Sequence, residues 1–223
     1  MIIIKSRISE ECKEKGNHMR IIRLIKIILI ITIVFLFASC STERFIVRSR
    51  DIEIQKQTMY GITVSVKFLN EDDLVERFGR VNNPFIAPLS ALGFTRMMVF
   101  EALVQNNSKN TADSVTIIMP LNKMEIQFGG KNKNPVNRFH LYEFWKNRIY
   151  KDDTYKKWNS SKINQLIKKT VLPNTVISKP QSDTPGLLVF MGRFPNYGTA
   201  DVYIPIFTED GNQLHNFRFI FQF

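Results

Sequence analysis

The sequence predicts a mainly β protein: an antiparallel β-sandwich of about seven to nine strands, with a two-helix insertion and an N-terminal signal helix. The clearest strand signal is the alternation of apolar with small or polar residues at Tyr60, Ile62, Val64, Val66 and Phe68. Comparable apolar runs recur along the chain, separated by short polar turns such as Glu209 to Gly211. With 44% hydrophobic residues among 223, the chain can bury a core, which excludes a largely disordered protein.

The predicted strands are connected mainly by hairpins, which favours antiparallel sheets over a parallel α/β arrangement. An Asn-rich segment at 106–110 separates two apolar runs and predicts a hairpin between them. Segment 209–211 predicts a second hairpin, between the last two strands. The strand candidates are 46–54 at the edge, 60–68, 94–105, 115–119, 124–128, 171–177, 186–190, 200–207 and 214–223.

A short helix is predicted over 70–79. Asn70 can cap its first turn, the carboxylates of Glu71, Asp72 and Asp73 suit the positive end of the helix dipole, and Gly79 can end the helix. Clustered carboxylates are also typical of calcium sites. An EF-hand loop needs donors at alternating positions, a central glycine and a terminal glutamate, so helix capping is the interpretation we favour.

The segment 137–170 interrupts the β pattern and predicts two helices, broken near 151–154. Its aromatic and aliphatic residues recur at steps of three and four, as expected for helices with one buried face. These residues are Phe139, Tyr142, Trp145 and Ile149, then Tyr155 and Trp158, then Ile163, Leu166 and Ile167.

Aromatic and basic residues are interleaved in this insertion, a pattern typical of recognition surfaces. The candidate binding residues are Trp145, Tyr155, Trp158, Lys156 and Lys157. The alternative is that the aromatic residues pack against the sandwich while the lysines form the solvated face. We expect such packing for Trp145 more than for Trp158, whose neighbours are polar.

The sequence gives little support for catalysis. It contains no GxSxG, HExxH or CxxC motif, and we expect neither a cofactor nor a metal. His140 lies one helical turn before Glu143, so a hydrolase or metal-dependent enzyme using this pair is the alternative, although a third ligand is missing. His215 is expected at an exposed strand edge.

The N-terminal region predicts export. Residues 27–39 are uncharged and follow Arg20, Arg23 and Lys26, which is the order of a signal peptide, and the run is too short for a typical membrane span. The residues Phe37, Ala38, Ser39 and Cys40 resemble the lipobox of bacterial lipoproteins, in the loose form found in spirochaetes. That resemblance implies cleavage before Cys40 and acylation of its thiol. An uncleaved signal anchor is the alternative.

The predicted organisation is a signal peptide at 1–39, whose true start is expected at Met19, a lipidated tether at 40–57, and the sandwich at 58–223. Removing the signal leaves 24 basic and 17 acidic residues, a net charge of +7. Cys12 is lost with the signal, so no disulfide is expected. Because Ser41 rather than Asp follows the cysteine, the lipoprotein resemblance implies the outer membrane, in an organism that has one.

The segments NNSKNTADSV, LPNTVISKPQ and GLLVF, followed by a final hairpin, resemble immunoglobulin-like sandwich domains of uncharacterised bacterial lipoproteins. The resemblance implies a fold and no catalytic residue. The alternation of Phe217, Phe219, Phe221 and Phe223 is also found at the ends of outer-membrane barrels, but we favour closure of a sandwich core.

Taken together, these features predict a lipid-anchored, non-enzymatic interaction module of the cell envelope. Its expected partners are the membrane, through the lipid, and an envelope protein or anionic polymer. Nucleic acid is not expected, because the chain is exported and has no recognisable reader motif. The alternative is an assembly component that holds other envelope proteins.

Overall fold

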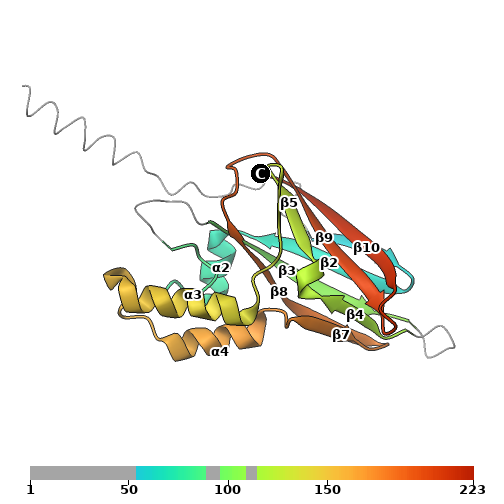
Figure 1. The fold of residues 1–223 in the computed structure, drawn as a ribbon, viewed down its shortest axis with the longest axis horizontal. Helices are drawn as coiled ribbons and strands as arrows, with labels where there is room; N and C mark the ends of the chain where they lie inside the picture. The colour runs from blue at the N-terminus through green and yellow to red at the C-terminus, as the bar shows by residue number, and fades with distance from the viewer. Residues whose placement is uncertain (1–53, 89–95, 109–114) are drawn as a thin grey trace, which may run out of the picture. The chain divides into compact units, whose positions relative to one another are not determined.

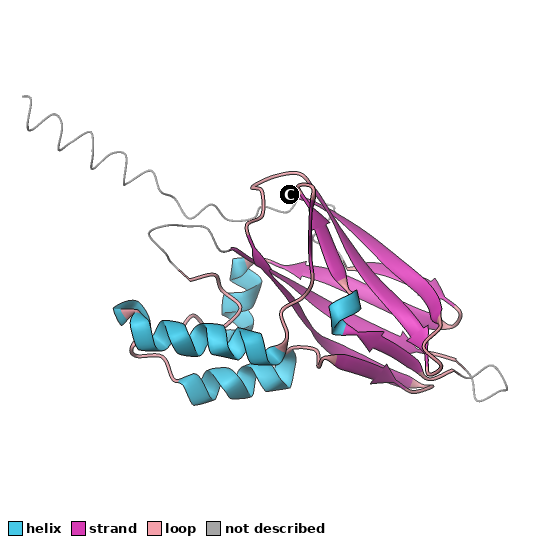
Figure 2. Cartoon of the chain, viewed as in Figure 1, coloured by secondary structure: helices cyan, strands magenta, loops and turns pink. Residues whose placement is uncertain are grey.

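The computed structural model describes residues 54–88, 96–108 and 115–223, which form two antiparallel sheets and three α-helices. The sheets pack face to face as a β-sandwich, and the helices gather at one side of it (Figures 1 and 2). This confirms the predicted mainly β sandwich with a helical insertion. The predicted signal helix and Cys40 fall outside the described residues. So does the predicted strand 46–54 except for Ile54, which lies just before β1.

The first sheet has four strands in the order β1-β2-β3-β8, and all of its pairs are antiparallel. β3 therefore pairs along its length with β2 on one side and with β8 on the other. The strands are β1 (Gln55–Met59), β2 (Ile62–Leu69), β3 (Arg96–Asn106) and β8 (Ser182–Gly192).

The second sheet is built around β9 (Thr199–Thr208), which pairs with β10 (Gln213–Gln222). β4 (Ile117–Pro120) and β5 (Glu125–Phe128) both pair with β9, at different levels, because the 3₁₀ turn η2 (Leu121–Lys123) breaks what would be one strand. The edges beyond them are β7 (Thr175–Ser178) and β6 (Lys131–Lys133). β4 and β5 correspond to the predicted strands 115–119 and 124–128, whereas the polar β6 was not among the candidates. The described strands number ten, where the sequence predicted seven to nine.

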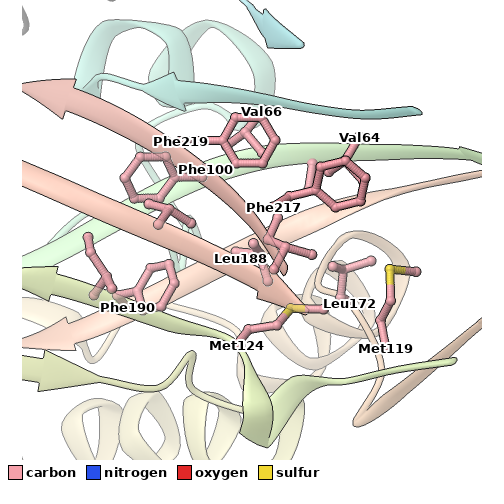
Figure 3. Close-up of a cluster of buried hydrophobic side chains, with 14 of the residues drawn as sticks. Val64, Val66, Phe100, Met119, Met124, Leu172, Leu188, Phe190, Phe217 and Phe219 are labelled. Carbon is pink, nitrogen blue, oxygen red and sulfur yellow. The ribbon is translucent and has the colours of Figure 1, made fainter. Parts of the chain in front are cut away.

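The main core lies between the two sheets (Figure 3). Phe217, Phe219 and Phe221 of β10 are fully buried there, opposite side chains such as Val66 and Phe100 of the first sheet. The Phe100 and Phe221 ring centroids lie 4.9 Å apart. The predicted closure of the sandwich by the alternating phenylalanines is confirmed.

The first sheet is also buried on its outer face, at the end where β2 stops. In β3, Met98 and Phe100 face the main core, whereas Met97 and Val99 belong to a second cluster of buried residues beneath the helices. Leu187 and Val189 of β8 join this second cluster. Continuous apolar runs of this kind are typical of strands covered on both faces.

The helix α2 (Glu71–Phe78) covers part of this outer face. It has the predicted caps: the Asn70 side chain accepts from the Asp73 backbone N–H, Asp73 accepts in return from Asn70, and Gly79 follows the last turn. Arg77 makes two hydrogen bonds to Glu101 of β3, at 2.6 and 2.9 Å. These bonds hold the pKa of the Glu101 carboxyl below its usual range.

The predicted insertion forms α3 (Arg138–Lys151), the 3₁₀ turn η3 (Asp153–Tyr155) and α4 (Ser160–Thr170). Asn137 caps α3 and Asn159 caps α4 through their side chains. We call residues Arg138 to Thr170 the helical layer. The prediction of two helices broken near 151–154 is confirmed.

The hairpin predicted around 106–110 is wrong. β3 belongs to the first sheet and β4 to the second, so these two strands do not pair as a hairpin. The reason is that β2 and β8 already occupy both edges of β3, which leaves no edge on which β4 can pair.

The strand β1 begins at Gln55, within the segment 40–57 that the sequence assigned to the tether. Its polar residues give no alternation, because it is an edge strand. The side-chain amide of Gln55 donates to the backbone oxygen of Ile220 and accepts from its N–H, and Gln57 donates to the oxygen of Arg218. These amides satisfy backbone groups at the open edge of β10. Unpaired backbone groups at a sheet edge would otherwise favour edge-to-edge association with another chain.

Asn106, at the end of β3, connects three segments. It is 1% exposed, and its amide nitrogen donates to the backbone oxygens of Val115 and Ser178. Its amide oxygen accepts from the backbone N–H and the hydroxyl of Ser108. One side chain therefore holds the crossing to β4 against the turn after β7.

We predict that Asn106→Ala lowers the free energy of unfolding by about 3 kcal/mol, because it leaves several buried polar groups without partners. Asn107→Ala is the matched control, since Asn107 is exposed, and should change the free energy by less than about 0.5 kcal/mol. Urea unfolding followed by circular dichroism measures both values. Equal losses in the two variants would contradict this role of Asn106.

Candidate functional site

The aromatic residues at the turn of the helical layer form one cluster. Trp145 and Trp158 are stacked with ring centroids 4.9 Å apart, and Tyr155 meets Trp145 edge-on at 5.5 Å. Tyr155 and Trp158 are also edge-to-face, at 4.9 Å. The Trp145 indole N–H donates to the backbone oxygen of Pro84, at 2.9 Å. The cluster therefore fastens the turn between α3 and α4 to the loop after α2.

The candidate binding residues consequently lie in different environments. Trp145 is fully buried and Tyr155 is 5% exposed, so neither offers a surface to a partner, while Trp158 is partly exposed. Lys156 and Lys157 are exposed, and Lys156 pairs with Asp153. The structure brings the three aromatic residues together as packing, with the two lysines outside them.

Two aromatic residues of α3 point away from the sandwich. Phe139 is 66% exposed and Tyr150 is 86% exposed. With Glu143 and Lys146 they follow the spacing i, i+4, i+7, i+11, which places all four on one helix face. We call these four residues the outer stripe. The sequence placed Phe139 on the buried face, but Leu141 and Trp145 occupy that face.

The signal for the outer stripe was present in the sequence. α3 carries apolar residues around most of its circumference, and such a helix is amphipathic only weakly. In α4, by contrast, Ile163 and Ile167 are buried on one side and lysines lie on the other. Surplus aromatic residues on one helix of such a pair indicate a second, outward-facing apolar stripe.

Positive charge is concentrated in the helical layer. Residues 138–170 contain nine Lys or Arg and three Asp or Glu, whereas the rest of the described chain contains eleven and ten. Almost all of the net charge of the described residues therefore sits on this layer. The exposed lysines are Lys146, Lys151, Lys156, Lys157, Lys162, Lys168 and Lys169.

An open depression of about 750 Å³ lies at the C-terminal end of α3. Arg148 and Asp152 lie 3.4 Å apart in its lining, and Arg148 also lies over the Phe144 ring. Hydrogen bonds from Thr154, first from its backbone N–H, lower the pKa of the Asp152 carboxyl, and Arg148 adds to that lowering. The depression thus has an anionic and a cationic wall that neutralise each other.

The acid–base candidates contact other side chains. His140 is exposed, next to the Phe139 ring, and the Glu143 carboxylate pairs with Lys146 at 3.3 Å. His215 lies on β10 with its ring edge-on to Tyr60 and Phe217. Within residues 54–88, 96–108 and 115–223, no three His, Cys, Asp or Glu side chains are grouped as a metal site requires.

The carboxylates that invited a calcium interpretation belong to the start of α2. Asp73 completes the cap with Asn70 and lies 3.9 Å from Lys67, and Glu71 lies 3.4 Å from Arg80.

Among the residues that the structure describes, no helix is both long and apolar enough to cross a bilayer.

No family model matches this chain, and no curated protein matches it. A solved structure that it resembles is the crystal structure of a DUF4426 family protein from Pseudomonas aeruginosa. The two share 10% sequence identity, the TM-score is 0.34, and the similarity covers 79% of this chain and 97% of that one. No activity or ligand follows from a likeness of this degree.

We predict that Trp145→Phe lowers the free energy of unfolding by about 2 kcal/mol, because it leaves the Pro84 oxygen without its donor and loses buried volume. Trp158→Phe serves as control and should cost less than about 1 kcal/mol, since Trp158 is partly exposed. Urea titrations compare the two variants. A larger loss for Trp158→Phe would refute the assignment of Trp145 as the centre of the cluster.

Proposed function

We propose that this protein is a lipid-anchored lipoprotein of the cell envelope that acts as a non-enzymatic interaction module. The single observation that carries the interaction role is the helical layer, which combines almost all of the net positive charge of the described residues with two exposed aromatic rings. Long-range attraction to anionic partners and rigid apolar contact area are the two contributions that such a surface supplies.

The proposed anchor is Cys40, acylated after removal of residues 1–39. The lipobox-like residues Phe37 to Cys40 support it, together with the basic and apolar segments before them. A single acyl chain gives marginal membrane binding, whereas two or three give stable attachment. The outer membrane is the proposed location in an organism with two membranes.

The separation between buried core residues and exposed aromatic rings also supports an interaction module. The sandwich buries its apolar residues between the sheets and beneath the helices, so its folding does not require the exposed rings of Phe139 and Tyr150. Exposed aromatic rings that make no core contact are available to a partner, and on this layer they lie among exposed lysines. An envelope protein or anionic polymer is the proposed partner class.

Mass spectrometry of the amino terminus of protein purified from membranes tests the anchor. We expect an acylated Cys40 as the first residue, and we expect Cys40→Ala to accumulate as full-length precursor. Thr42→Ala is the matched control, because it changes a residue close to Cys40, leaves the thiol in place and should leave processing unchanged. A bare Cys40 in an unprocessed, soluble chain would overturn the proposal.

A further inference from the structure

The strand β1 begins near the end of the first sheet that the helical layer covers. Gln55 pairs with Val66 and Met59 pairs with Ile62. Because β2 leads into α2 at its C-terminal end, the first residue of β1 lies closer to α2 along the sheet than its last residue does. The helical layer covers that same end of the first sheet (Figure 1). β1 therefore begins on the side of the sandwich that the helical layer covers.

The register of the sheet supports this placement. Leu69 pairs with Val99 and Val99 with Val189, and all three residues lie beneath the helices. The turn of Lys179 to Gln181, in contrast, lies beside Asn106 at the opposite end of the same sheet. The protein thus has a basic helical end and a distal end formed by hairpin turns.

The chain length limits how far the sandwich can stand from its anchor. Cys40 and Ile54 are fourteen residues apart, a distance of at most about 50 Å when fully extended. A domain of this size is about 40 Å across. The helical end is consequently within reach of the bilayer that would hold the acyl chains.

We infer that the partner of the helical layer is the anionic headgroup surface of the membrane that holds the Cys40 anchor. The inference goes beyond the partner class of the proposed function and rests on its anchor, because the anchor supplies the high local concentration that a weak surface contact needs. The protein then has two attachments to one bilayer: acyl chains in the hydrocarbon, and the helical layer against the headgroups.

The chemistry of the outer stripe fits this partner. Phe139 and Tyr150 are three helical turns apart, about 16 Å along α3, and both project outward with Lys146 between them. Aromatic residues concentrate at membrane interfaces, and lysines there interact with anionic headgroups. Lysines of α4, such as Lys168 and Lys169, extend the positive surface beside the stripe.

Amine footprinting on vesicles tests the inference. Processed protein, with its amino terminus verified, is reconstituted on neutral phosphatidylcholine vesicles and on vesicles containing about 30% phosphatidylglycerol. We expect labelling of Lys146, Lys168 and Lys169 to fall about threefold on the anionic vesicles and to recover in about 0.5 M salt, which screens the attraction. Lys179, at the distal end, should be labelled equally throughout.

Variants separate the aromatic contribution from the anchor. Phe139→Ser/Tyr150→Ser should remove most of the protection while the protein still floats with both kinds of vesicle. The control is Tyr60→Asn, which changes a similarly exposed tyrosine in a turn at the distal end. Asparagine tolerates the positive φ of that position. The lysine labelling of the Tyr60→Asn variant should therefore equal that of the unaltered protein.

The two proposals fail in different ways. Protein that does not float with neutral vesicles contradicts the anchor, whereas protein that floats but is labelled equally on both vesicle types overturns the membrane contact. Protection of the same lysines by soluble polyphosphate but not by anionic vesicles also overturns it, in favour of an anionic polymer.

Discussion

The burial of β3 and β8 on both faces is the constraint from which the rest of the structure follows. Met97 and Val99 alternate with Met98 and Phe100, so packing against the second sheet leaves a row of apolar side chains on the other side. Exposure of that row would cost about 25 cal/mol for each Å² of apolar surface. The helices α2, α3 and α4 cover it, and they are therefore part of the core rather than an addition to it.

This constraint explains which parts of the helical layer are available for function. Leu141, Trp145, Ile163 and Ile167 are committed to the cover, and the Trp145 cluster fixes the turn between the two helices. Phe139, Tyr150 and the lysines are left on the outside. The same helices thus complete the fold with one face and present charge and aromatic rings with the other, which is why function is proposed there and not on the sheets.

The sequence predicts the structure correctly where one physical signal decides it. The alternation of Phe217 to Phe223 identified the buried face of β10, and Asn70 with Gly79 fixed the limits of α2. The hairpin predicted at segment 106–110 is wrong, because a polar turn does not specify the sheet that the next strand joins. In α3, apolar residues lie on several faces, so the periodicity is ambiguous. The sequence therefore predicted Phe139 as a buried residue where the structure buries Leu141. The start of β8 was missed because Pro185 argues against a strand; an edge strand accommodates it.

Native-state hydrogen exchange tests most directly the claim that the helices and the first sheet form one cooperative unit. If that claim holds, the slowest amides of α3, α4, β3 and β8 exchange with the same free energy of opening, equal to that of global unfolding, because loss of the helices exposes the outer apolar row. Exchange of α3 and α4 through a smaller opening, with β3 and β8 still protected at the global value, would contradict it.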